Sequence, residues 1–268
     1  MAEGTFTKLE RYELKYHIPL AMVGKIARFL EPWCKLDDYS TKSADHFYWV
    51  SSLYLDSPRH TFFRWKEEGL ENRFNMRVRT YGQNPAVDGP RFYEVKHKRA
   101  DIVEKTRGTL LGGHAERLWT DTENVMAHAN PKEKANLELF LRNSLTYNAS
   151  PVLLTQYRRI AWFGIHEDYA RVTIDTGLRW REENGFDYTV DPQHMRATDN
   201  SDYFRPGTNA VLELKCPRSE VPWWMLDLIR YLNLERGSFS KFGSAMCEYL
   251  RAPTSRVQNS FQEYSHGS

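Results

Sequence analysis

The stretch RFNMRVRTYG at residues 73–82 alternates charged and uncharged side chains with a period of two. Successive side chains of a β-strand point to opposite faces, so this alternation predicts a strand. Arg73, Arg77 and Arg79 then share one face, and mostly apolar side chains share the other. A charged strand face usually meets water at the protein surface. Taken alone, the stretch is compatible with that interpretation.

The same alternation returns in the segments RYELKY, FYEVKHK, RVTIDTGLRW and AVLELKC. Each of them interleaves charged side chains of both signs with apolar ones. The charged positions are Arg11, Glu13, Lys15, Arg77, Arg79, Glu94, Lys96, Lys98, Arg171, Asp175, Glu213 and Lys215. Repetition in so many strands favours one sheet whose charged faces lie together.

We expect the fold class α+β, with a closed antiparallel eight-stranded β-barrel and flanking helices. Closing such a sheet turns one face of every strand inward. If the charged face is the inner one, burying it without water would cost far too much free energy. The interior must therefore be wet or filled by an anion. The length suits one domain over residues 1–252, followed by a polar, disordered tail at 253–268.

Turn and capping residues place the other elements between these strands. After the first strand, further strands are expected near 46–55, 73–81, 91–98, 101–110, 151–164, 168–183 and 209–216, with helices near 19–30, 58–69, 112–119, 131–145, 222–232 and 239–250. Residues 184–208 are expected to form a loop.

The overall charge is nearly balanced, because 37 Lys and Arg face 35 Asp and Glu. This balance argues against a protein that coats polyanions in general, and we expect no nucleic-acid partner. Cys34, Cys216 and Cys247 are isolated, which indicates neither disulfides nor a zinc site. The chain has no long apolar run and no signal-peptide core. We therefore expect a cytoplasmic protein without a membrane span, which a membrane protein partner could recruit.

Arginine and lysine on an inner face suit a ligand with several phosphates, since guanidinium groups grip phosphate oxygens bidentately. Carboxylates would repel such a ligand unless they held a divalent cation. Glu13, Glu94, Asp175 and Glu213 are the candidate metal ligands, and Mg²⁺ or Mn²⁺ is the expected cofactor. The chain contains neither a Walker loop nor a GxSxG motif, which argues against P-loop enzymes and serine hydrolases.

The chain resembles the catalytic domain of the VTC polyphosphate polymerases, within the CYTH-like triphosphate tunnel metalloenzyme superfamily. The matching segments run in family order from about Lys8 to Leu250: RYELKY, RVRTYG, YEVKHK, EKTRG, QYRR, RVTIDTGL, VLELK and FSKF. CYTH relatives carry an ExExK motif in the first strand. Here Arg11 stands at the first acidic position, as in the VTC branch.

The resemblance implies that Lys15, Arg77, Arg79, Lys96, Lys105, Arg107, Arg158, Arg171 and Lys241 line the tunnel and bind phosphates, with Glu213 as metal ligand. The expected catalytic residues among them are Lys15, Arg77, Arg79, Lys96, Arg158 and Arg171. The expected substrate-binding residues are Arg11, Lys98, Lys105, Arg107, Lys215 and Lys241.

The leading functional hypothesis is a polyphosphate polymerase that transfers the γ-phosphoryl group of ATP onto a growing chain. The first alternative is a metal-dependent triphosphatase that acts on inorganic triphosphate or nucleoside triphosphates, with water as the acceptor. Arg11 in place of a carboxylate favours the polymerase, because one acidic group fewer weakens both a two-metal site and activation of water. The other alternative is a non-catalytic module that binds polyphosphate.

Overall fold

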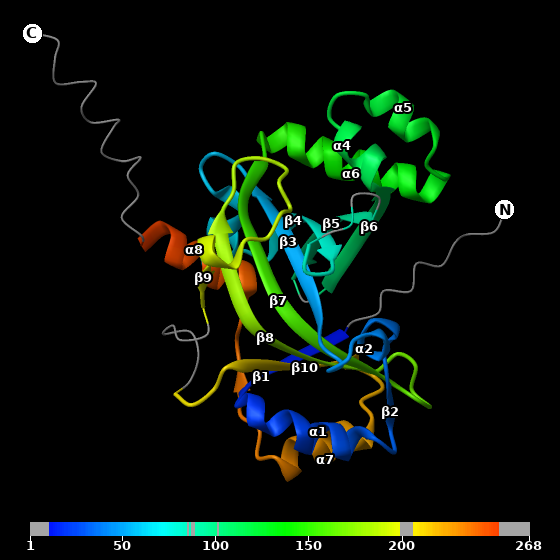
Figure 1. Ribbon diagram of the computed structural model, residues 1–268, viewed down its shortest axis with the longest axis vertical. Helices are drawn as coiled ribbons and strands as arrows, with labels where there is room; N and C mark the ends of the chain where they lie inside the picture. The colour runs from blue at the N-terminus through cyan, green and yellow to red at the C-terminus, as the bar shows by residue number, and fades with distance from the viewer. Residues whose placement is uncertain (1–10, 85, 87–88, 101, 199–205, 252–268) are drawn as a thin grey trace, which may run out of the picture.

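The computed structural model describes residues 11–84, 86, 89–100, 102–198 and 206–251. Within these residues the chain forms one antiparallel sheet of 11 strands, in the order β11-β1-β10-β8-β7-β3-β4-β5-β6, with β2 paired to β7 and β9 to β8 (Figure 1). The strands are β1 (Arg11–Ile18), β2 (Cys34–Leu36), β3 (Tyr48–Asp56), β4 (Asn72–Tyr81), β5 (Pro90–Arg99), β6 (Ile102–Leu111), β7 (Ser150–Gly164), β8 (Arg171–Glu182), β9 (Arg196–Ala197), β10 (Ala210–Pro217) and β11 (Arg236–Gly237).

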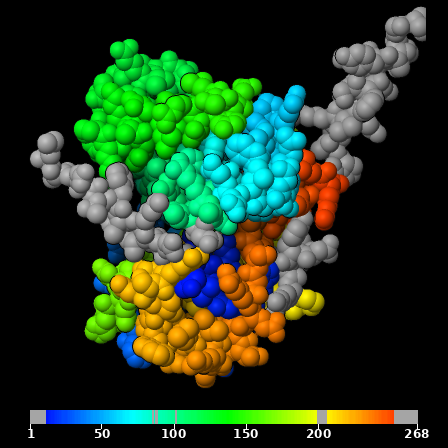
Figure 2. Space-filling view, turned by 180° about the vertical axis from the view of Figure 1, so that it is seen from behind, coloured from blue at the N-terminus to red at the C-terminus, as the bar shows by residue number. Residues whose placement is uncertain are grey.

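Helices flank the sheet and gather mainly at its two ends (Figure 1). They are α1 (Val23–Leu30), α2 (Asp38–Lys42), α3 (Thr61–Glu67), α4 (Gly112–Arg117), α5 (Thr122–Ala127), α6 (Pro131–Tyr147), α7 (Trp223–Tyr231) and α8 (Lys241–Arg251), with short 3-10 turns at Leu20–Met22 and Pro192–His194. Seen from behind in Figure 2, the green α4–α6 region and the orange α7 region lie at opposite ends of the molecule. Among the described residues no helix combines the length and the apolar character that a membrane crossing needs.

Two apolar layers hold the helices to the sheet. In one, α1 and α7 bury Ile26 and Leu228 against Leu212 and neighbouring strand residues. In the other, α6 buries Leu137 and Phe140 against β5 and β6. Full burial of each such side chain contributes about 1.5–3 kcal/mol. Both layers lie behind the charged face, which confirms the predicted separation of apolar and charged sides.

Two helix starts show how local sequence sets the boundaries. The carboxylate of Asp56 accepts hydrogen bonds from the backbone amides of Phe62 and Phe63, each at 2.9 Å, so it stabilises the first turn of α3. This helix begins at Thr61, later than the sequence predicts. At α6, the side chain of Asn130 accepts from the amide of Glu133 at 2.9 Å, as a cap followed by Pro131 predicts.

The closed eight-stranded barrel predicted from the sequence is wrong. Among the described residues, the strands at the two ends of the order, β11 and β6, have no pairing with each other. The reason lies at β1, because β11 pairs with Lys15 and Tyr16 and so occupies part of the edge that closure would need. The sheet still curls far enough for Lys96 of β5 to reach Glu13 of β1, with Nζ and Oε2 2.9 Å apart. We call the gap between β1 and strands β4–β6 the seam.

Several small elements were missed in the sequence: β2, α2, α5, β9 and β11. They are short, so the periodicity of their side chains cannot reveal them. The three cysteines are free, as predicted. One domain over 1–252 stays a prediction, and the predicted tail at 253–268 lies outside the described residues.

Candidate functional site

The strand register lines up charged side chains across the inner face of the curled sheet, which we call the charged face. Arg77 of β4 lies opposite Glu94 of β5, and Glu94 lies opposite Arg107 of β6. On the other half of the sheet, Lys15 of β1 lies opposite Glu213 of β10. Side chains opposite each other on antiparallel strands share one face. The period-two pattern of the sequence therefore becomes rows of alternating charge.

Glu94 is the centre of the first cluster, and its side chain is only 1% exposed. Its carboxylate forms close ion pairs with Arg77 Nε at 2.7 Å, Lys105 Nζ at 2.6 Å and Arg107 Nη2 at 2.6 Å. Arg79 Nε lies farther away, at 3.8 Å. Burial alone would raise the pKa of Glu94, but the charges of Arg77, Arg79 and Lys105 outweigh it and hold the pKa far below its usual range. We call this group the Glu94 nest.

The Glu94 nest carries more positive charge than its carboxylate can balance. Burial, and then the charges of Arg79 and Arg77, lower the pKa of Lys105 to about 6 despite its contact with Glu94. The Nε group of Arg79 is buried and makes no hydrogen bond within the described residues, because the Glu94 oxygen at 3.8 Å is beyond hydrogen-bond distance. A buried donor without an acceptor is costly. The nest is therefore ready to accept a further anion.

A second cluster forms around Asp175 of β8. Arg159 grips this carboxylate bidentately, with Nε at 2.6 Å and Nη2 at 2.8 Å, and Lys241 Nζ lies 2.5 Å from it. Burial raises the pKa of Asp175, but the charges of Arg159 and Lys241 reverse this effect and lower the pKa to about 2. Lys241 comes from the start of α8, so a helix that follows the sheet supplies part of the charged face.

Arg159 was missed in the sequence, whereas its neighbour Arg158 was predicted to be catalytic. A β-bulge between Gln156 and Arg158 shifts the register of β7 and brings Arg159 opposite Asp175. Arg158 lies on the other side of the sheet, where it pairs with Asp45 and its guanidinium stacks over Phe47 at 5.2 Å. The motif QYRR contains both arginines, but strict alternation cannot reveal a bulge. The structure thus does not bring Arg158 to the site.

The other predicted residues are spread over the charged face. Glu213 receives Lys215 Nζ at 3.2 Å and Lys15 Nζ at 4.0 Å. Arg171 is exposed at the end of β8, with its guanidinium 4.4 Å from the centre of the Phe163 ring, apart from both clusters. Lys98 follows Lys96 along β5 toward the seam, and the side chain of Arg11 lies outside the described part of the chain.

The four predicted metal ligands are not gathered into one group. Within the described residues, no set of three or more His, Cys, Asp or Glu side chains could hold a metal ion. Glu94 and Asp175 each contact two or more cations at 2.5–2.8 Å, so these two do not fit a metal. Among the described residues Glu13, in contrast, accepts hydrogen bonds from Lys96 alone. Mg²⁺, however, commonly binds one or two carboxylates and completes its shell with phosphates and water.

Glu213 fits a site of that kind. It lies opposite Thr173, whose buried hydroxyl has no hydrogen-bond partner within the described residues. Glu13 is the next acidic side chain, on the adjacent strand β1, and the charges of the two carboxylates interact. Burial raises the pKa of Glu213, but Lys215 and Lys15 hold it well below its usual range, so the carboxylate is ionised. Glu213 with Glu13 is therefore the candidate pair for Mg²⁺ or Mn²⁺.

The adjacent residues Arg158 and Arg159 lie on opposite sides of the sheet, so their variants test directly which side is functional. We expect Arg159→Ala to lower kcat/KM by about tenfold or more, because it removes a cation from the charged face and leaves Asp175 with one partner. Arg158→Ala should retain most of the activity, since that side chain lies on the opposite side of the sheet. Thermal melting of both variants checks folding. A larger kinetic loss for Arg158→Ala would contradict this assignment.

Comparison with solved structures gives weak overall matches. A candidate adenylate cyclase from Vibrio parahaemolyticus is 12% identical over 88% of this chain and 97% of its own, with a TM-score of 0.44. One from Bacillus halodurans is 10% identical over 85% and 92%, with a TM-score of 0.49. A candidate adenylyl cyclase from Hippeastrum, described as having a dominant triphosphatase activity, is 11% identical over 86% and 92%, with a TM-score of 0.47.

A search among curated proteins found no match. The family model of the VTC domain, in contrast, matches residues 10–250, which is nearly the whole chain. The matched region includes both charged clusters and the candidate metal ligands, and it agrees with the resemblance noted in the sequence. The chain therefore belongs to the VTC domain family.

Proposed function

We propose that this protein is a polyphosphate polymerase that transfers the γ-phosphoryl group of ATP onto an inorganic polyphosphate chain. The observation that carries the proposal is the Glu94 nest, where three arginine cations and Lys105 converge on one buried carboxylate. Their surplus charge suits a ligand with several phosphates, because guanidinium and ammonium groups form strong charge-assisted hydrogen bonds to phosphate oxygens. Membership of the VTC domain family supports the same class of substrate.

The proposed transfer needs no nucleophile from the protein. A terminal oxygen of the acceptor phosphate attacks the γ-phosphorus of ATP, the bond from that phosphorus to the β,γ-bridging oxygen breaks, and ADP leaves. Arg77, Arg79 and Arg107 hold the oxygens of the transferred group and stabilise its charge. Lys15 and Lys96, on opposite sides of the seam, orient the remaining phosphates.

A bound Mg²⁺ or Mn²⁺ ion would neutralise phosphate charge and polarise the transferred group. Glu213 and Glu13 would hold the ion through their carboxylates. Lys215 and Lys15 keep Glu213 ionised, which preserves it as a ligand at any pH near neutrality.

The lowered pKa values of the carboxylates on the charged face favour phosphoryl transfer to a phosphate acceptor over transfer to water. Within the described residues of the charged face, Glu13, Glu94, Asp175 and Glu213 all pair with cations, and the pKa of each is lowered. A carboxylate with a low pKa is a weak general base, so it activates water poorly. A phosphate acceptor is already ionised at neutral pH and needs no base.

The test is incubation of the full chain with ATP and Mn²⁺ or Mg²⁺, followed in parallel by polymer gels and a phosphate-release assay. We expect long polyphosphate and stoichiometric ADP. Phosphate release without polymer would instead establish a triphosphatase. Tight binding of tripolyphosphate without either product would establish a binding module.

We expect Glu213→Gln to lower metal-dependent turnover by about 10- to 100-fold at limiting metal, since Glu13 remains as a second ligand. The amide keeps the shape of the side chain but removes a charged, hard ligand. The half-activating concentration of Mn²⁺ should rise, while binding of tripolyphosphate without metal persists. Glu116→Gln, on the exposed surface of α4, is the matched control. Unchanged activation by metal would exclude Glu213 as a ligand.

A further inference from the structure

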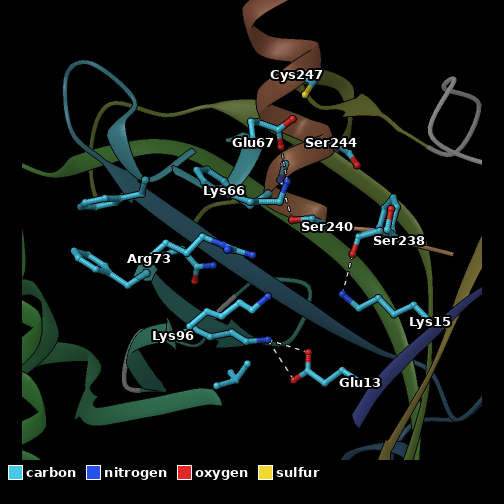
Figure 3. A pocket seen from close by; sticks show the side chains of 18 of the residues that line it. Glu13, Lys15, Lys66, Glu67, Arg73, Lys96, Ser238, Ser240, Ser244 and Cys247 are labelled. Carbon is cyan, nitrogen blue, oxygen red and sulfur yellow. Dashed lines mark hydrogen bonds and ion pairs between the residues drawn. The ribbon is translucent and has the colours of Figure 1, made fainter. Parts of the chain in front are cut away.

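A cavity of about 610 Å³ opens along the seam, between β1 on one side and strands β4 and β5 on the other (Figure 3). We call it the seam pocket. The side chains of Glu13, Lys15 and Lys96 line it, so it is continuous with the charged face. Helices α3 and α8 cover it from above in that view. Its volume lies within the range of about 300–1,000 Å³ that is typical of ligand sites.

The walls of the seam pocket carry basic side chains that belong to neither cluster described above. They are Lys66 of α3, Arg73 of β4, Lys98 of β5 and Arg236 of β11. Arg73 lies opposite Lys98 in the strand register, so these two extend the charged face beyond Lys96. Among the described lining residues the only carboxylates are Glu13, which pairs with Lys96, and Glu67, which pairs with Lys66. The pocket therefore has a surplus of positive charge.

The remaining wall supplies neutral hydrogen-bonding groups and close backbone. Ser238, Ser240 and Ser244 line it from β11 to α8 (Figure 3). A methyl group at Gly243 would collide with Nζ of Lys66, so glycine at this position lets the lysine ammonium lie directly against α8. Lys15 Nζ donates to the carbonyl of Phe239 at 2.8 Å, which ties this wall to β1. Ammonium, guanidinium and hydroxyl groups arranged around one cavity suit an anion rich in oxygen.

We infer that the seam pocket is a second anion subsite, which binds the part of a linear inorganic polyphosphate that extends beyond the charged face. This inference rests on the proposed function, because it takes polyphosphate as the ligand. The cations Lys96, Lys98, Arg73 and Lys66 line one cavity that adjoins the charged face. A polyanion that repeats its charge along a flexible chain matches such a group of cations. The pocket thus selects for chain length.

The experiment compares binding of tripolyphosphate with binding of a much longer linear polyphosphate. Isothermal titration calorimetry on the full chain, at one fixed ionic strength and without ATP or metal, gives both affinities. In Lys66→Met/Arg73→Met we expect affinity for the long chain to fall about tenfold, and affinity for tripolyphosphate to change far less. Lys132→Met/Arg142→Met, which removes two exposed charges from α6, should leave both affinities near wild type.

Thermal melting would reveal a folding defect in the double variant. Two further variants keep the test informative in that case. Lys66→Met alone removes one partly exposed cation from α3 and should give a smaller loss in the same direction. Gly243→Ala displaces the ammonium of Lys66 without removing its charge and should also weaken binding of the long chain selectively. An equal loss for both ligands, or none for either, would overturn the inference.

The result of these titrations does not depend on whether the proposed polymerase activity is found. The titrations contain no ATP, so a protein that fails to make polymer can still show a seam pocket that selects long chains. Conversely, an active polymerase whose variants keep the wild-type ratio of the two affinities has no such subsite.

Discussion

Replacing Arg79 with alanine is expected to lower kcat/KM for ATP by about 100- to 1,000-fold while changing the melting temperature of the free protein little. The guanidinium is nearly buried, its Nε group has no acceptor within the described residues, and Arg77 crowds it with like charge. Loss of one preorganised donor to a transition-state oxygen has a kinetic effect of this size. Removing a cation from a crowded nest also relieves repulsion, which offsets the lost packing.

Thermal melting with and without tripolyphosphate separates a role in binding from a role in folding. We expect the ligand-induced rise in melting temperature to shrink in Arg79→Ala. Arg79→Lys should recover only part of the activity, because an ammonium cannot reproduce the planar fork. Arg142→Ala, at an exposed position of α6, is the control. If the free variant melts far below wild type and still gains normal stability from the ligand, Arg79 is structural.

Glu94→Gln is expected to lower the free energy of unfolding by about 3 kcal/mol, the largest stability effect that we predict. Breaking a buried ion pair typically costs about 3–5 kcal/mol, because the partner charges are left uncompensated. The lower end applies here, since Lys105 and Arg107 are partly exposed and remain partly solvated. The three arginine cations Arg77, Arg79 and Arg107 around a neutral amide would repel one another.

The same variant should gain more stability from tripolyphosphate than the wild type does, because the anion replaces the missing carboxylate charge. Urea denaturation with and without the ligand measures both effects, and Glu138→Gln on the exposed side of α6 serves as the control. A variant as stable as wild type would show that Glu94 does not hold the nest together. A ligand effect no larger than in wild type would show that phosphates bind elsewhere.

The charged face could be predicted from the sequence because alternation is a local property of a strand. Arg77, Glu94 and Lys96 lie where a period of two places them, with no register shift between β4 and β5. Glu213 and Lys215 likewise share the face with Lys15 and Glu13. In these strands each side chain is assigned to a face by counting from its neighbour.

The rest depends on tertiary structure. Because of the bulge in β7, Arg159 rather than Arg158 lies on the charged face. No residue type in QYRR predicts this bulge. The pairing of each carboxylate with its own cations depends on which strands are neighbours, so four separate acidic positions looked like one metal site in the sequence. The prediction of a closed sheet was wrong because β11, which pairs with β1, is only two residues long and is too short to be predicted from the sequence.

The unclosed sheet changes how the proposed polyphosphate substrate would reach the interior. Backbone hydrogen bonds around a complete ring would force every substrate to be threaded from an end. Here, within the described residues, the side-chain pair Lys96 and Glu13 spans the seam where a strand ladder would otherwise stand. A partly exposed ion pair breaks easily, and salt or a competing phosphate weakens it further. If the proposed function is correct, a long polyphosphate chain would therefore enter through the seam from the side.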